Sequence, residues 1–217
     1  VTLGSVIAEG PQNGLYRPQS DYGSGVPIVR INDFGNEGQV VTRTTNRVAA
    51  SPAEVGTYGL AEGDLLINRV NSLTHLGKVA LVGILPEPMV FESNMMRFNV
   101  DLARVLSSYV FRFLTTARVR EQIVGKAKRA VAQSSINQGD VKSIPLPQPT
   151  IGMQMEIASF LDAVDHKLAA EEARRQALDA LFKTLLYDLM TGHVRVKEPP
   201  NGEVREGLQL DSESDAK

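Results

Sequence analysis

The feature that most limits the fold of this chain is a long heptad repeat near its C-terminal end. Apolar residues recur there in alternating steps of four and three, the spacing of the seam along a coiled-coil helix. Prolines before position 150 and Gly192 after the last apolar turn delimit the helix, which we expect to span about 38 residues or about 57 Å. The seam positions are Ile157, Leu161, Val164, Leu168, Leu178, Phe182, Leu185 and Leu189.

Two positions in the middle of this repeat are charged. Glu171 and Arg175 occupy seam positions, and a polar pair buried in a coiled coil sets register and orientation. A helix packed on its own domain is the simpler alternative, but leaving a whole apolar seam in solvent is unfavourable. We therefore expect a partner helix against this seam.

Composition limits the rest of the chain. With 217 residues and 42% hydrophobic content, the chain can bury one core and carry one appendage. The absence of cysteine fits a reducing compartment, and neither an apolar run of about 18 residues nor a secretion leader is visible. We expect a cytoplasmic protein with no membrane contact. The first residue, Val1, leaves open a processed product or part of a longer protein.

The small net charge hides an asymmetry between the two parts of the chain. Residues 1–150 carry 15 Lys and Arg against 12 Asp and Glu, whereas residues 151–217 carry 8 against 13. Within the first part, the run 118–129 holds five basic residues against one Glu. Such a run favours contact with phosphate, but taken alone it is more often a solvated face.

Up to about position 100 the sequence is typical of strands separated by Gly, Asn, Asp and Pro turns. Two polar loops, 43–47 and 68–72, concentrate Arg and Asn, the side chains that hydrogen-bond guanine and adenine edges. Asp101 is expected to cap a helix over 102–114 that covers one side of the sheet. The expected strands are 26–31, 39–43, 64–69, 78–85 and 89–100.

Catalytic groups are scarce in this sequence. Its three histidines, His75, His166 and His193, are far apart, and an exposed helix face explains the pairing of His166 with Asp162 better than a metal site does. Gly77-Lys78 lacks the glycine and hydroxyl of a phosphate-binding loop. We find no adenine-methyltransferase motif and no glycine turn suited to S-adenosylmethionine, so we expect no catalysis by this chain alone.

The order of the motifs resembles the DNA-specificity subunits of type I restriction-modification systems. Residues 134–147, followed by Gln154, look like the end of a target recognition domain in that family, and 185–196 is similar to the end of its long helix. Residues 25–30 and 63–69 match its opening and central strands more loosely. The resemblance covers about 1–196 and is strongest over 134–196.

Two departures from the family pattern stand out. The start of the long helix keeps only Pro149 and Gln154 of the usual segment. Family members typically carry two recognition domains and two long helices, whereas this chain has one of each. It is either the second half of a longer protein or a half-subunit that forms a homodimer, with its seam against the same seam reversed.

The resemblance implies an α+β fold in three parts. Residues 1–150 would form a mixed, mainly β target recognition domain that binds double-stranded DNA, residues 151–192 a coiled-coil spacer and dimerisation arm, and residues 193–217 a disordered acidic tail. The chain would read one half of a bipartite target and position methyltransferase (M) and restriction/translocase (R) subunits. It would bind no cofactor or metal itself, since S-adenosylmethionine, ATP and Mg²⁺ belong to those partner subunits.

Base and phosphate contacts are assigned to the polar loops and the basic run. The main alternative is an assembly module whose coiled coil docks a methyltransferase without reading DNA, and a self-contained DNA-modifying enzyme is a more distant one. The residues expected to contact bases or phosphate are Arg43, Thr44, Asn46, Arg47, Asn68, Arg69, Asn71 and Lys78, with Lys126, Lys128 and Arg129 on the backbone phosphates.

Overall fold

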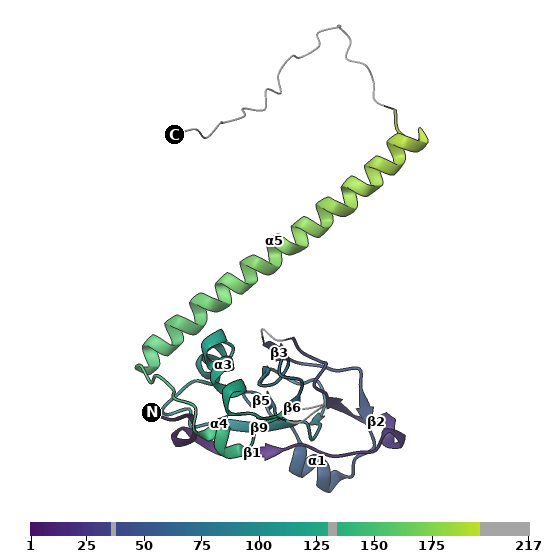
Figure 1. The fold of residues 1–217 in the computed structure, drawn as a ribbon. Coiled ribbons are helices and arrows are strands. Elements are labelled where there is room, and N and C mark those ends of the chain that lie inside the picture. Colours follow the sequence, from purple (N-terminus) through teal and green to yellow (C-terminus); the bar gives the residue numbers. More distant parts are fainter. Residues whose placement is uncertain (36–37, 130–133, 196–217) are drawn as a thin grey trace, which may run out of the picture. The chain divides into compact units, whose positions relative to one another are not determined.

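The computed structural model describes residues 1–35, 38–129 and 134–195, and it has the predicted mixed α+β fold followed by a long helix (Figure 1). The chain forms two units, Val1–Val164 and Asp165–Lys217. The first unit therefore includes the first turns of the long helix, beyond the predicted boundary at residue 150. Most of the predicted acidic tail, from residue 196 on, lies outside the described residues.

The core of the first unit is a five-stranded sheet with strand order β1-β9-β5-β7-β3. The central strand β5 pairs antiparallel with β7 and β9, while β3 runs parallel to β7. All four residues of β5 are buried, because clusters of apolar side chains cover both faces of the sheet. The strands are β1 (Ile7–Asn13), β3 (Gln39–Val41), β5 (Leu65–Asn68), β7 (Val79–Val82) and β9 (Met95–Val100).

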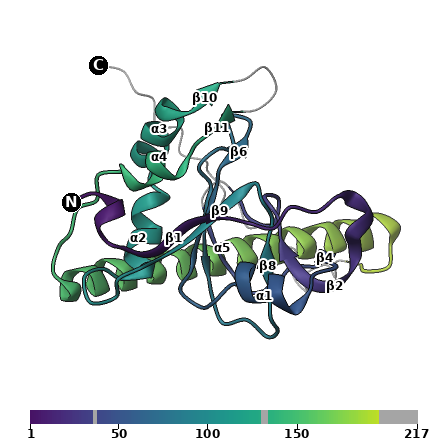
Figure 2. The same ribbon diagram turned by 90° about the horizontal axis from the view of Figure 1, so that it is seen from below.

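Two three-stranded sheets complete the domain. One has the order β4-β2-β8 and the other the order β10-β11-β6. Figure 2 shows them at opposite ends of the central sheet, with α3 and α4 beside the second of them. Their strands are β2 (Tyr22–Val29), β4 (Arg47–Val48), β6 (Val70–Asn71), β8 (Val90–Phe91), β10 (Lys128–Arg129) and β11 (Ser134–Ser135).

Short helices connect and cover these sheets. Two of them begin with a capping box, in which Ser51 and Glu54 cap α1, and Asn137 and Asp140 cap α4. Each box satisfies backbone amides that a helix N-terminus leaves unpaired. The helices are η1 (Leu3–Ser5), η2 (Gln19–Asp21), α1 (Pro52–Tyr58), α2 (Ser107–Leu114), α3 (Ala117–Lys126), α4 (Gln138–Lys142) and α5 (Ile151–Thr191).

The predicted helix from residue 102 is wrong at its start. Asp101 accepts a hydrogen bond from the amide of Ala103 at 3.0 Å within a turn, and α2 begins only at Ser107. The cap of α2 comes from the long helix, since the side-chain oxygen of Gln154 accepts a hydrogen bond from the amide of Leu106 at 2.9 Å. A cap supplied from a distant segment leaves no local sequence signal.

The long helix α5 spans 41 residues, or about 62 Å at about 1.5 Å per residue. Thr150 precedes it and accepts a hydrogen bond from the amide of Met153 at 3.4 Å. At its end Gly192 adopts a positive φ of 75°, and its amide donates to Leu189 at 3.3 Å. This glycine is the predicted C-terminal stop, because a residue with a Cβ would be strained there.

Candidate nucleic-acid interface

The small sheet β10-β11-β6 brings together candidate residues from two separate parts of the sequence. Ser134 lies opposite Asn71 on one side and Arg129 on the other, and Ser135 lies opposite Val70 and Lys128 in the same way. The polar loop after β5 and the end of the basic run, which follows α3, therefore lie side by side. Sequence spacing alone gives no indication of this pairing.

Lys126 and Lys128 are exposed next to this sheet. The ammonium group of Lys126 lies 2.5 Å from the hydroxyl of Ser143, and Arg120 of the same helix donates to the carbonyl of Thr74. Helix α3 thus holds the loop that follows β6. The backbone of Arg129 forms part of strand β10.

Asn68 and Lys78 lie beneath this loop. Asn68 is fully buried, and its side-chain amide donates to the carbonyl of His75 at 3.1 Å. Lys78 is only 6% exposed, and its ammonium group lies 5.4 Å from the ring centre of Phe34. Burial, followed by the charge of Arg120, lowers the pKa of Lys78. Both side chains are therefore buried under the loop and support it.

Arg69 and Asn71 remain nearer the surface. Arg69 donates from its guanidinium to the carbonyl of Ser93 at 3.2 Å, and its backbone amide donates to Asn94 at 2.8 Å. Asn71 accepts a hydrogen bond from the amide of Ser72 at 2.7 Å, which leaves its side-chain NH₂ group to donate. A half-buried asparagine amide of this kind can pair with an adenine edge.

The second predicted loop, 43–47, ends in β4, which belongs to the other three-stranded sheet, β4-β2-β8. Its polar side chains are held by Asp33, whose carboxylate accepts from Thr44 at 2.9 Å and from Asn46 at 3.0 Å. Arg47 is paired with Glu87 at 2.6 Å. Arg43 is the exposed cation of this loop, and among the described residues no partner holds it.

Glu92 and the two residues after it make hydrogen bonds to segments in both halves of the domain. The carboxylate of Glu92 accepts from the amide of Ile31 at 2.6 Å and from Arg30 at 3.3 Å, while the next two residues hold Arg69. The guanidinium of Arg30 lies 5.0 Å from the ring centre of Tyr22. The turn between β8 and β9 thus holds Arg69 on one side and Arg30 on the other, and the amide of Arg30 in turn donates to Asp33 at 2.8 Å.

The same turn borders a small polar cavity of about 170 Å³ that the sequence does not predict. Tyr16 at its rim is 75% exposed, and aromatic and arginine side chains of this kind can stack on bases. The aromatic-basic pair Tyr16-Arg17 is the sequence signal that points to it. The lining residues are Leu15, Tyr16, Arg17, Gln19, Tyr22, Arg30, Glu92, Ser93 and Asn94.

The apolar seam of α5 is exposed along its whole length. The exposed fraction of the eight predicted seam residues ranges from 37% for Leu161 to 64% for Phe182. The charged residues in the middle pair with helix neighbours, Glu171 with Arg174 at 3.8 Å and Arg175 with Glu172 at 2.7 Å. These short-range pairs leave the seam free to face another helix.

The acidic and histidine side chains of the described residues are the groups that could hold a metal ion or act as acids and bases. In the ranges 1–35, 38–129 and 134–195 there is no group of three His, Asp or Glu side chains that could hold a metal ion. Asp64 has a raised pKa, chiefly because it is buried, but it accepts from the amide of Ala61 and lies 3.9 Å from Arg97. Its surroundings are those of a buried structural carboxylate. Despite its length, neither α5 nor another described helix is apolar enough to cross a membrane.

Solved structures share this fold. The HsdS subunit from Thermoanaerobacter tengcongensis gives a TM-score of 0.58 at 17% identity, over 92% of this chain and 51% of that chain. The type I restriction-modification S subunit from M. genitalium gives 0.58 at 14% identity, over 88% and 45%. The fold is therefore that of type I specificity subunits.

Sequence comparison then defines the family. The model of the type I restriction modification DNA specificity domain matches residues 11–180, and the chain belongs to this family, as the motifs in its sequence predict. The chain is 28% identical over 208 residues to the putative type I restriction enzyme MjaX specificity subunit of Methanocaldococcus jannaschii, covering 94% of this chain and 49% of that relative. It is 27% identical over 148 residues to the EcoKI specificity subunit of Escherichia coli K12, covering 67% and 32%. The chain spans half or less of the length of these relatives.

Proposed function

We propose that this chain is a DNA-reading part of a type I restriction-modification specificity subunit and recognises one half of a bipartite target. The observation that carries the proposal is the pairing of Asn71, Ser134 and Arg129 across the small sheet. The proposal rests on this pairing because it puts the side-chain amide of Asn71, which would read a base, beside a basic segment. Phosphate contacts fix a protein on the duplex, and base-edge contacts supply the specificity.

The contacts in this proposal are Asn71, Arg69 and Arg43 for bases, with Lys126, Lys128 and Arg129 on phosphate. Asn68 and Lys78 support the loop from below. Thr44, Asn46 and Arg47 make protein contacts in this structure and would reach DNA only by exchanging those partners.

The long helix provides the spacing in this proposal. Its apolar seam would meet the same seam of a second copy, or of a second helix in a longer protein, in the reversed direction. Half-sites on one face of B-DNA are about 34 Å apart per helical turn, and a helix of about 62 Å can span that distance with overlap. The target would then have two read parts and an unread spacer.

Catalysis lies outside this chain in the proposal. Methyltransferase subunits that use S-adenosylmethionine, and restriction subunits that use ATP and Mg²⁺, would be the partners that the specificity subunit positions. The domain and helix supply binding and orientation to that assembly.

Titration of the full chain with duplex DNA at two salt concentrations tests the proposal. DNA reading predicts that the logarithm of the affinity falls linearly with the logarithm of salt concentration, by about 0.9 per phosphate contact. The assembly-module alternative is favoured by the exposed seam and by the protein contacts of the 43–47 loop. It predicts dimerisation with no duplex binding at either salt concentration.

A further inference from the structure

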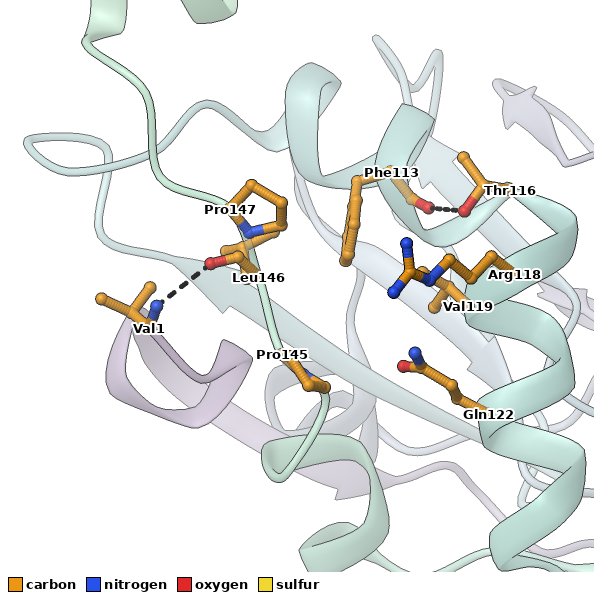
Figure 3. Close-up of a pocket in the computed structure, with 9 residues that line it drawn as sticks. All are labelled: Val1, Phe113, Thr116, Arg118, Val119, Gln122, Pro145, Leu146 and Pro147. Atoms are coloured by element: carbon orange, nitrogen blue, oxygen red, sulfur yellow. Dashed lines mark hydrogen bonds between the residues drawn. The ribbon is translucent and has the colours of Figure 1, made fainter.

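A groove of about 540 Å³ lies between α3 and the segment that leads toward α5 (Figure 3). It is within the 300–1,000 Å³ range that is usual for ligand sites. Arg118, Val119 and Gln122 of α3 form one wall, with Phe113 and Thr116 above them. Pro145, Leu146 and Pro147 form the other wall, beside Val1.

Both walls are fixed to the body of the domain, the α3 wall by the buried side chains of Val119 and Ile123 and the proline wall by hydrogen bonds. Leu3 donates from its amide to Ile144 at 2.7 Å, and Leu146 donates to Val1 at 2.8 Å. The hydroxyl of Tyr109 donates to the carbonyl of Pro147 at 3.1 Å. The groove is therefore formed before anything binds, which reduces the entropic cost of binding.

The groove has one charged side chain set among apolar ones. No acidic residue is among its nine lining residues, and Arg118 is exposed, with no ion-pair or hydrogen-bond partner within the part of the chain that the structure describes. Gln122 follows Arg118 by one helical turn and presents an amide to the same space. An arginine in this position favours a carboxylate, which it can bind with two parallel hydrogen bonds.

The opposite wall determines how an occupant can be held. Pro145 and Pro147 have no N–H group, and the amide of Leu146 is already bonded. An added β-strand would therefore find no donors along this wall. An occupant must bind through its side chains, one apolar against Phe113 and the prolines and one acidic against Arg118.

We propose that this groove binds a segment of a partner protein that presents an apolar side chain next to a carboxylate. The charge balance and the apolar lining together favour such a segment over duplex DNA, because a phosphate backbone needs a row of cations and gains nothing from Phe and Pro walls. The proposal does not depend on DNA reading and adds a protein-docking surface to the domain.

The test uses NMR titration of the isotope-labelled full chain with hydrocinnamate and with its uncharged amide, hydrocinnamamide. We expect saturable chemical-shift changes at Val119, Gln122 and Leu146. The acid should bind with about millimolar affinity, and the amide about tenfold more weakly. A capped peptide with adjacent Phe and Glu should likewise bind more tightly than the same peptide with Phe and Gln.

Two variants separate the groove from general charge effects. Arg118→Gln should abolish the preference for the acid, whereas Arg195→Gln removes the same charge outside the groove and should leave it intact. Thermal melting verifies that both variants are folded. Shifts that never saturate, or equal binding of acid and amide by the unaltered chain, would overturn the proposal. Displacement of hydrocinnamate by random duplex DNA, with weaker duplex binding by Arg118→Gln, would overturn it in favour of a phosphate site.

Discussion

The side-chain oxygen of Gln154 accepts a hydrogen bond from the backbone amide of Leu106 at 2.9 Å, which makes the first turns of α5 part of the recognition domain. The same side chain donates to the carbonyls of Arg104 at 3.2 Å and Pro149 at 2.9 Å. One fully buried glutamine thus satisfies three backbone groups, and the helix cannot begin elsewhere without leaving them unpaired.

Replacement of Gln154 by Ala should lower the free energy of unfolding by about 3 kcal/mol, because buried backbone groups lose their partners. Urea denaturation followed by circular dichroism measures this loss. Gln148→Ala is the matched control, since this exposed glutamine makes only a long contact of 3.4 Å to Arg104 and should cost less than about 0.5 kcal/mol. Equal losses in the two variants would show that Gln154 does not join helix and domain.

Replacement by Ala should affect different properties at the two asparagines of the 68–72 loop, stability at Asn68 and base discrimination at Asn71. Asn68→Ala removes a buried amide that closes the loop, so we expect a loss of about 1–3 kcal/mol in unfolding free energy. Asn71→Ala should leave stability within about 0.5 kcal/mol and reduce discrimination at one base position by about 1–3 kcal/mol. Denaturation and competition binding with single-base variants of the target give the two readouts. If Asn71→Ala weakened all sequences equally, Asn71 would not read a base.

The exposed Lys128 should contribute affinity without specificity. Lys128→Ala is expected to weaken binding to cognate and random duplexes alike and to lower the salt slope by about one. Lys183, which pairs with Asp179 on α5 at 2.7 Å, supplies the control variant Lys183→Ala with the same loss of charge. Anisotropy titrations over a range of salt concentrations measure both slopes, and an unchanged slope for Lys128→Ala would remove it from the interface.

Stability should depend on pH through Lys78. Because burial lowers the pKa of Lys78 below its ordinary value of 10.5, the unfolded chain holds this proton to higher pH than the folded protein does. The free energy of unfolding should therefore rise with pH between the folded pKa and 10.5. In Lys78→Met this alkaline rise should be smaller, as measured by urea denaturation across that range. An identical pH profile in the variant would show that Lys78 titrates as an exposed lysine.

The seam of α5 should be required for pairing with another helix. Phe182→Glu places a charge at a seam position and should weaken self-association of the chain at least about tenfold, because an unpaired charge would be buried. Tyr187→Glu adds the same charge at an exposed position outside the seam and is the control. Analytical ultracentrifugation measures both. A wild-type chain that remains monomeric at high concentration would assign the seam to a different partner helix.

Sequence predicts those parts of the fold that depend on local pattern. The heptad repeat and Gly192 locate α5 closely, and the apolar alternation locates β5 and β7, because periodicity directly reflects burial. The single strand predicted over 89–100 is wrong, since a turn divides it into β8 and β9, which belong to different sheets. The pairing of β6 with β11 and the cap from Gln154 depend on contacts between distant segments. No local pattern encodes such contacts.

The residues of the candidate interface are likewise predictable from sequence only in part. Residue type alone selects Asn68 and Asn71 equally, yet one lies in the core and the other on the small sheet, because only the register of the strands decides which is covered. Asp33 and Glu92 do not stand out in sequence, although Asp33 holds the 43–47 loop through Thr44 and Asn46 and Glu92 holds Arg30 and Ile31. Their importance lies in what they position.

Selection of bound duplexes from a random pool by the full chain tests the central claim most directly. A domain that reads DNA on a paired helix should enrich a target with two short defined parts and an undefined spacer, palindromic if two copies of this chain pair. A single short motif would still show reading, but without the paired helix. No enrichment at low or moderate salt would contradict the assignment of DNA reading to this domain.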